Sequence, residues 1–318
     1  MSDINDQVES QRFIKNLSGK TKFIVSRNSR NIGLSRQTYQ NKLDYMRDQK
    51  IITNFTININ PNIRPNNLKY VMIEIKTNPK EPELVKKLLE IPQLRMLDGI
   101  IGDFSLFALF IFKSPDEYYQ TLNTIDKIMA KSYFKKYQII ETIKVFKTNG
   151  ISIIESEIPI DIDEIDYKIL NILRDAQGIK PISTYEISKI FKEQLEIEIS
   201  QSTIHNRIKK LEREGAILNY VVNFSPKKIG FEGKYLLRIK PKDPSKYNEL
   251  ALRLDKNRNI TDLFRIGEQY GLFAIVRVEN IEDYADFIRD LYVSEEIEDT
   301  YTNFVLDELI PYTNFIIL

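Results

Sequence analysis

The chain has one histidine, His205, within the stretch ISQSTIHNRIKKLEREGAI (199–217). Imidazole serves as a general base and as a metal ligand, so its surroundings decide whether it does chemistry. With no cysteine and one histidine, the chain cannot assemble a zinc cage. No nucleophile-elbow motif accompanies His205, and neither GxxxxGKS/T nor GxGxxG offers a nucleotide cradle. We therefore predict no catalytic centre, no cofactor and no metal site.

The 318 residues are 42% apolar and 29% charged, and the net charge is +1. This length predicts two or more domains, and the composition is that of an ordinary soluble protein. With so small a net charge, a nucleic acid would have to bind a local basic patch. The first residues, MSDINDQVES, are polar, and no run of eighteen apolar residues occurs, so we expect a cytoplasmic protein.

A second stretch, LSRQTYQNKLDYMRDQKII (34–52), resembles the one around His205, and the similarity continues at a constant offset of 165 residues. Pairs at this offset include Ser35 and Ser200, Asn54 and Asn219, Asn58 and Asn223, Lys69-Tyr70 and Lys234-Tyr235, and Gly102 and Gly267. Matches spread over about eighty residues indicate two copies of one unit. We place their connection at GISIIESEIPIDID (150–163).

Each copy begins with a helical part. In copy two the apolar stripe of the first helix is formed by Ile165, Ile169, Ile172 and Leu173. Ser183 and Ser200 are placed to cap a second and a third helix, and Gly215 to end the third. The stretch AILNYVVNFSP (216–226) alternates as a two-stranded wing would. In copy one we expect a short first helix, VESQRFIKNLS (8–18).

The rest of each copy follows the order βαββαβ, which is that of a ferredoxin-like fold. In copy one the segments are LKYVMIEIKT, PELVKKLLEI, LRMLDGII, SLFALFIFK, PDEYYQTLNTIDKIMAKSYF and YQIIETIKVF. We predict an α+β fold made of two tandem copies, each a winged helix-turn-helix followed by a ferredoxin-like domain. The predicted domains are residues 1–64, 66–150, 160–230 and 232–318.

The third helix of each copy has an apolar back and a polar front. The back is formed by Tyr39, Leu43 and Met46 in copy one and by Ile204, Ile208 and Leu211 in copy two. The front carries side chains that hydrogen-bond base edges, and in a helix-turn-helix this part enters the major groove. A solvated helix face is the plain alternative, but the same layout in both copies favours DNA recognition. The predicted DNA-binding residues are Arg27, Arg30, Ser35, Arg36, Gln37, Gln40, Asn41, Lys42 and Arg47, and Ser200, Gln201, Ser202, His205, Asn206, Arg207, Lys209, Lys210 and Arg213.

The two copies differ in the net charge of their helical parts. Residues 20–50 hold eight basic and two acidic side chains, a net charge of +6, whereas residues 183–217 hold six of each. Because phosphate affinity grows with the number of charges neutralised, we expect the first copy to bind DNA more strongly.

Several of these segments resemble the Lrp/AsnC family of feast/famine transcription regulators, of archaeal type. They are IDEIDYKILNILRDAQG (162–178), ISQSTIHNRIKKLEREGAI (199–217), VNFSPKKIGF (222–231) and GDFSLFALF (102–110). The resemblance implies a winged helix that binds double-stranded DNA and a ferredoxin-like RAM domain that dimerises through its sheet. A tandem chain could then pair its own two sheets as a pseudo-dimer, and two such chains could form a homodimer. The two winged helices, which we call the two DNA-binding heads, differ in sequence and would suit an asymmetric DNA site.

The resemblance also implies a small effector, such as an amino acid, at a turn that in the family tends to be Gly-Asp-Tyr-Asp. The corresponding residues here are Gly102, Asp103, Phe104 and Ser105, and Gly267, Glu268, Gln269 and Tyr270. Both copies lack the second acid, and copy two has an extra residue, Gly271. A glycine in a tight turn also has a purely conformational explanation, so an effector stays an open alternative.

Two further alternatives remain. Siroheme decarboxylases are similar in architecture and depend on histidine and arginine around a tetrapyrrole. Because the one histidine lies on a predicted recognition helix, we favour a regulator and not an enzyme. The other alternative is an assembly partner of Lrp-like proteins that binds no DNA.

Overall fold

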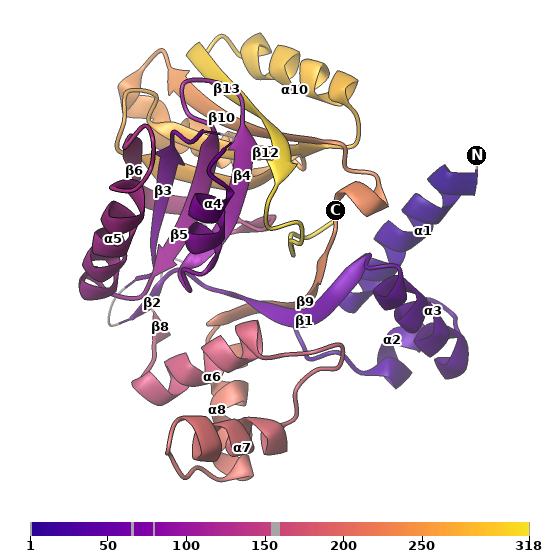
Figure 1. Cartoon of the computed structure of the whole chain (residues 1–318). Helices are drawn as coiled ribbons and strands as arrows, with labels where there is room; N and C mark the ends of the chain where they lie inside the picture. Colours follow the sequence, from indigo (N-terminus) through magenta and orange to yellow (C-terminus); the bar gives the residue numbers. More distant parts are fainter. Residues whose placement is uncertain (1, 65–66, 79, 154–159, 318) are drawn as a thin grey trace. The chain divides into compact units, whose positions relative to one another are not determined.

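The same order of elements occurs twice along the chain, and each occurrence begins with three helices and one strand (Figure 1). The computed structural model describes residues 2–64, 67–78, 80–153 and 160–317. In copy one the elements are α1 (Ser2–Leu17), α2 (Val25–Asn31), α3 (Arg36–Asp48) and β1 (Ile52–Ile59). In copy two they are α6 (Glu164–Asp175), α7 (Thr184–Gln194), α8 (Gln201–Arg213) and β9 (Ile217–Phe224). The predicted caps Ser183 and Ser200 are confirmed.

Helix α1 corrects the expectation of a short first helix, since it spans 16 residues against 12 in α6. The two helices are held in different ways. Asp163 and Asp166 form a capping box that fixes the start of α6. In α1 the buried residues Phe13, Ile14 and Leu17 lie in the second half, so packing there supports turns that begin before residue 8.

Strands β1 and β9 pair antiparallel with each other and form a ribbon shared by both copies. This corrects the prediction of a two-stranded wing within one copy. Almost all of β9 is buried, because helices of both copies pack against the ribbon. The repeated asparagines meet here: Asn58 donates a hydrogen bond to Asn219 (2.9 Å), and Asn223 donates one to Asn54 (3.0 Å).

The last residues of the chain join this helical unit, which comprises Met1–Pro65, Ser156–Gly230 and Tyr312–Leu318. Thr313 pairs with Phe224 on the ribbon, and the Phe315 ring packs against the Phe224 ring at 5.0 Å. The predicted boundary at 318 is therefore corrected, because the apolar end of the chain is buried on the ribbon. The predicted connection 150–163 lies partly outside the described residues. Its described ends form β7 (Ile151–Ser152) and β8 (Ile160–Asp161), and β8 pairs with β2 (Ile63–Arg64).

The second unit comprises Asn66–Glu155 and Phe231–Pro311, and the predicted βαββαβ order is confirmed in both copies. In copy one it is β3 (Lys69–Ile75), α4 (Pro82–Leu89), β4 (Leu94–Ile100), β5 (Leu106–Phe112), α5 (Pro115–Met129) and β6 (Tyr137–Thr148). In copy two it is β10 (Gly233–Pro241), α9 (Tyr247–Asp255), β11 (Ile260–Ile266), β12 (Leu272–Val278), α10 (Ile281–Val293) and β13 (Ile297–Glu308). Short 3-10 helices, η1 (Lys227–Ile229) and η2 (Pro244–Lys246), precede β10 and α9.

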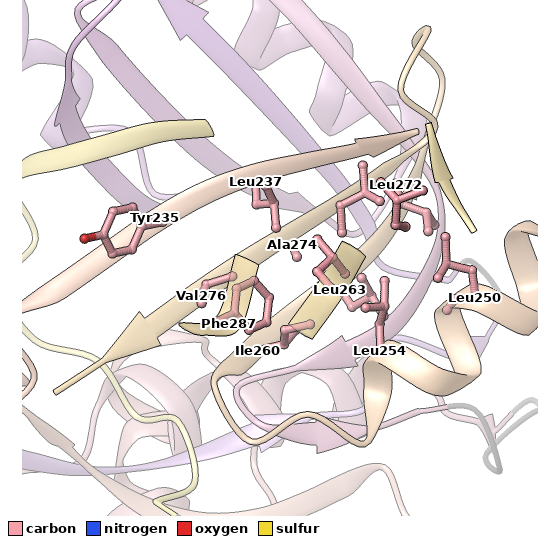
Figure 2. Close-up of a cluster of buried hydrophobic side chains, with 14 of the residues drawn as sticks. Tyr235, Leu237, Leu250, Leu254, Ile260, Leu263, Leu272, Ala274, Val276 and Phe287 are labelled. Atoms are coloured by element: carbon pink, nitrogen blue, oxygen red, sulfur yellow. The ribbon is translucent and has the colours of Figure 1, made fainter. Parts of the chain in front are cut away.

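The strands of both copies form one sheet, in the order β11-β12-β10-β13-β4-β5-β3-β6-β7. Strand β13 pairs with β4, and β6 pairs with β11, so the sheet closes on itself across the two copies. Alternate residues face opposite sides of a strand. One side packs on the helices and forms an apolar core in each copy; the copy-two core includes Leu237, Leu263 and Phe287 (Figure 2).

Candidate nucleic-acid interface

Helices α3 and α8 begin in the same way. Ser35 and Ser200 occupy the N-cap positions, and each hydroxyl accepts a hydrogen bond from a backbone N–H three residues later, at 3.1 Å. Such caps satisfy donors that would otherwise be unpaired at the helix start. The predicted backs are confirmed as buried: Tyr39, Leu43 and Met46 in α3, and Ile204, Ile208 and Leu211 in α8. Packing therefore fixes which face of each helix is left to solvent.

The predicted DNA-binding residues lie on this solvent face or on α2. Exposed ones are Arg27, Arg30, Ser35, Arg36, Gln37 and Asn41 in copy one, and Ser200, Gln201, Ser202, His205, Asn206, Lys209 and Arg213 in copy two. Half-buried ones are Gln40, Lys42, Arg47, Arg207 and Lys210. In α3 the amide of Gln37 donates to Asn41 at 2.9 Å, and that of Gln40 donates to Asp44 at 3.2 Å. The side chains of His205 and Asn206 bind no other described residue, so their polar groups are available to a ligand.

The basic side chains of α8 are neutralised by carboxylates. Lys209 pairs with Glu212 at 2.7 Å and Arg213 with Glu214 at 3.5 Å. Arg207 and Lys210 reach back to Asp166, at 2.8 and 3.5 Å, and Arg207 also contacts Asp163 at 2.6 Å. Asp166 is completely buried, so Arg207 and Lys210 are its counter-ions. Although burial opposes it, hydrogen bonds from the Asp166 backbone and from Arg207 lower the pKa of Asp163.

Arg207 thus ties α8 to the start of α6, and its loss is expected to act on stability. In Arg207→Ala the buried Asp166 keeps Lys210, at 3.5 Å, as its one cation among the described residues, so we expect the free energy of unfolding to fall by about 2 kcal/mol. Urea unfolding of the full chain measures this. The matched variant Arg213→Ala, whose partner lies on the surface, should cost less than about 0.5 kcal/mol. Equal costs for the two variants would show that Arg207 has no structural role.

The basic side chains of copy one are only partly neutralised by carboxylates. Lys42 pairs with Glu9 at 2.6 Å, and Arg47 pairs with Asp44 and Asp48 at 2.7 and 2.9 Å. Arg27 donates to the backbone carbonyls of Thr21 and Lys22. No described acidic side chain forms an ion pair with Arg27, Arg30 or Arg36. These three arginines therefore present uncompensated positive charge.

Residues from the predicted effector turns of both copies line one pocket of about 220 Å³. It is lined by Asp103 and Phe104 and by Glu268, Gln269 and Tyr270. The other predicted residues have backbone or structural roles. Gly102 has φ +143°, and a Cβ there would lie 3.1 Å from the Asn303 amide. Ser105 accepts from the Thr77 backbone at 2.7 Å. Gly267 does not line the pocket; in copy two the positive φ belongs to Gly271.

Our sequence analysis did not predict the charged residues at the centre of this pocket. Arg238 is nearly buried and bridges Glu74 and Glu268, at 2.7 Å each, and it donates to Asn303 at 3.2 Å. Burial raises the pKa of Glu268, and Arg238 opposes this shift. A weak signal existed: Glu74 lies between two isoleucines in KYVMIEI, and Arg238 lies between Leu237 and Ile239 in GKYLLRIKP. In the part of the chain that the structure describes, no group of acidic or histidine side chains could hold a metal ion, and no helix could span a membrane.

Comparison with known proteins decides the family. Residues 235–315 match the model of the Lrp/AsnC ligand binding domain. The HTH-type transcriptional regulator FL11 of Pyrococcus horikoshii is 31% identical over 147 residues, which are 46% of this chain and 91% of the relative. The chain belongs to the Lrp/AsnC family. A second relative, the HTH-type transcriptional regulator Ptr1 of Methanocaldococcus jannaschii, is 32% identical over 41% of this chain and 80% of its own length.

The alignments cover most of each relative but less than half of this chain, so these two relatives are about half as long as this chain. A solved structure of comparable extent is the siroheme decarboxylase NirDL. It aligns with a TM-score of 0.58 over 96% of this chain and 91% of its own, at 11% identity. At this identity the likeness concerns the fold alone.

Proposed function

We propose that this Lrp/AsnC chain is a sequence-specific DNA-binding transcription regulator built from two tandem units. The units are two helix-turn-helix domains (1–64 and 160–230), each followed by a ferredoxin-like RAM domain (66–150 and 232–318, apart from the last residues). The observation that carries the proposal is the pair of capped helices α3 and α8, each with a buried apolar back and a front of base-binding side chains.

The two helices support recognition of two different half-sites. Gln37 and Gln40 of α3 correspond to Ser202 and His205 of α8 at the repeat offset, so the donors and acceptors differ. In a homodimer both heads would be identical and would favour a palindrome. One chain with two distinct heads is therefore suited to an asymmetric operator.

Selection of binding sites from random duplex DNA by the purified full chain tests this proposal. We expect enrichment of one asymmetric motif and footprints that weaken strongly between 50 and 200 mM salt, as phosphate contacts require. Ser202→Ala with His205→Ala should relax the motif in one half only, whereas the surface control Lys86→Ala with Lys87→Ala on α4 should leave it unchanged. If no motif is enriched over the starting library, the chain is not a sequence-specific DNA-binding protein.

The pocket supports a small effector as part of the same function. Its volume of about 220 Å³ is below the range of roughly 300–1,000 Å³ for drug-sized ligands, so it suits a molecule of amino-acid size. Asp103 and Glu268 come from the turns of the two copies, so a ligand between them would contact both. Repeating the DNA-binding measurement with each amino acid in turn identifies an effector by a change in affinity.

The decarboxylase fold suggests an enzyme as the second candidate, since it spans nearly the whole chain. A tetrapyrrole is at least as large as a drug-sized ligand, and the described pocket at the turns is smaller than such ligands require. The family relatives, moreover, are transcriptional regulators. An absorbance band that appears when siroheme is added to the protein would favour the enzyme.

A further inference from the structure

The registers of the closed sheet identify equivalent positions in the two βαββαβ copies. Glu74 of β3 lies opposite Phe107 of β5, and Arg238 of β10 lies opposite Phe273 of β12. The two copies meet along two strand pairs, which we call seams: β4 with β13, and β11 with β6. Strand β11 is the counterpart of β4, and β6 is the counterpart of β13, so the seams agree with this equivalence. Arg238 therefore occupies in copy two the place that Glu74 occupies in copy one.

Identical residues meet at one of these equivalent positions. The rings of Phe107 and Phe273 stack at 5.3 Å with an angle of 8° between their planes. A phenylalanine pair would form equally well if copy one met a second copy one. This contact therefore holds the copies together without distinguishing them.

Opposite charges meet at the next position. The Arg238 guanidinium contacts the Glu74 carboxylate at 2.7 Å, and the two side chains are 5% and 7% exposed. If copy one paired with another copy one, two buried glutamates would face each other. If copy two paired with another copy two, two buried arginines would do so. The two glutamates would lose Arg238 as their partner, whereas each arginine would face a like charge and keep only Glu268 of its own copy, at 2.7 Å.

The side-chain contacts beside the two seams also differ between the copies. Asp98 of β4 lies opposite Phe107, and Phe264 of β11 lies opposite Phe273, so these two positions are equivalent. Asp98 is met by Lys234 of copy two at 2.6 Å. Phe264 is instead met by the ring of Tyr70 of copy one, at 5.7 Å. One seam has a buried ion pair where the other has an aromatic pair.

In the sheet Tyr70 corresponds to Lys234 and not to Tyr235, its match at the sequence offset of 165. The register decides this, because Val71 and Ile73 share the core-facing side with Tyr235 and Leu237. Tyr70 lies opposite Ile111 and Lys234 opposite Arg277, four residues beyond the central phenylalanines of β5 and β12. A second copy one would therefore bring Tyr70 to the buried Asp98, which would lose its ammonium. A second copy two would bring Lys234 to Phe264. The first exchange buries the Asp98 carboxylate without its cation, which is strongly unfavourable. In the second exchange Lys234 loses Asp98 and keeps only Glu308 of its own copy, at 3.2 Å.

We propose that these residues form a pairing code by which the RAM domain of copy one accepts copy two and rejects another copy one. The code consists of Glu74, Asp98 and Tyr70 in copy one and Arg238, Lys234 and Phe264 in copy two. It favours pairs of unlike copies and disfavours assemblies in which two like copies pair. The inference concerns only the sheet, and it stands whether or not the chain binds DNA.

A charge swap in the full chain tests the code. The background Glu268→Gln is used throughout, so that a reversed charge at 238 does not face Glu268. In this background Glu74→Arg and Arg238→Glu should each lower the folding equilibrium constant by about a hundredfold or more, measured by urea unfolding. The combined swap should recover most of that loss. If it is as unstable as the single variants together, complementarity does not govern the pairing and the proposal is wrong.

Exchange between chains gives a second readout, valid even if the single variants do not fold alone. Full chains carrying Glu74→Arg and Arg238→Glu receive different affinity tags and are refolded together. Copy one of each then matches copy two of the other, so we expect recovery of the mixed complex about tenfold above that of each variant refolded with its own differently tagged copy. Equal recovery in the mixed and the matched samples would overturn the code.

Discussion

Reversing Arg27, Arg30 and Arg36 to glutamate is expected to weaken DNA binding by about a hundredfold or more at 0.1 M salt. These arginines are exposed, and no described carboxylate pairs with them, so each can neutralise a phosphate at no cost to an existing ion pair. The slope of log affinity against log salt should become shallower by about 3. Fluorescence anisotropy of a labelled duplex, measured at several salt concentrations, gives both quantities.

The same number of reversals on α8 should cost about tenfold. Lys209, Lys210 and Arg213 already have carboxylates within 4.0 Å, so less counter-ion release is at stake. Lys86, Lys87 and Lys127, exposed on α4 and α5, provide a control with the same change of net charge. Circular dichroism confirms that each triple variant is folded. Equal losses for the α2–α3 and α8 triples would contradict the proposed asymmetry of the two heads.

The sequence predicted the elements well because their signals are local. Helix caps such as Ser35 and Ser200 and apolar backs such as Ile204 and Leu211 depend on residues within a few turns. The repeat at an offset of 165 doubled the signal, since each element was visible twice. The ribbon of β1 and β9 was mistaken for a wing because its partner strand lies in the other copy. Asn54 was recognised as the repeat of Asn219, but the hydrogen bonds across the ribbon, from Asn58 to Asn219 and from Asn223 to Asn54, were not predicted.

The sequence indicated which residues belong to the candidate sites, but not which residues they contact. A net charge of zero over residues 183–217 anticipated a weakly basic second head, yet the decisive acid for Arg207 is Asp166, which lies outside that stretch in α6. The pocket shows the same limit. Its turns were expected from the resemblance to the Lrp/AsnC family, whereas Glu74 and Arg238 come from strands and meet only when the sheet closes. Contacts between distant segments follow from topology, which no local pattern encodes.

Lys234→Met is expected to lower the free energy of unfolding at pH 7 by about 3–5 kcal/mol, the usual cost of breaking a buried ion pair. Lys234 is 4% exposed and is the counter-ion of Asp98, which is 1% exposed. It also contacts Glu308 at 3.2 Å, which keeps Arg277 as a partner after the substitution. Adding Asp98→Asn should restore much of the stability, because a neutral amide then replaces the buried carboxylate. Urea unfolding of the full chains measures both effects.

The exposed pair of Lys240 and Glu298 in the same strand region provides the matched control. Lys240 is 39% exposed, so Lys240→Met should cost less than about 1 kcal/mol. If both substitutions cost the same, burial of the ion pair is not what makes Lys234 important.

The dependence on pH separates the loss of a charge partner from the loss of packing. Burial raises the pKa of Asp98 even against Lys234, and without the ammonium it should rise further. A group whose pKa is raised in the folded state binds its proton there before the unfolded chain does, so acid relieves the penalty. The destabilisation by Lys234→Met should therefore shrink as the pH falls from 7 to 4.

Glu308 changes in the opposite direction in the unaltered protein. Burial would raise its pKa, but Arg277 and Lys234 outweigh burial and bring the pKa to about 2. Its contribution to stability is therefore complete above its ordinary pKa and is lost as the pH falls toward 2. The unaltered protein should lose stability between about pH 4.5 and 2 while the penalty of Lys234→Met diminishes. If that penalty is independent of pH, the methionine acts through packing, and Asp98 is not held as a buried carboxylate by Lys234.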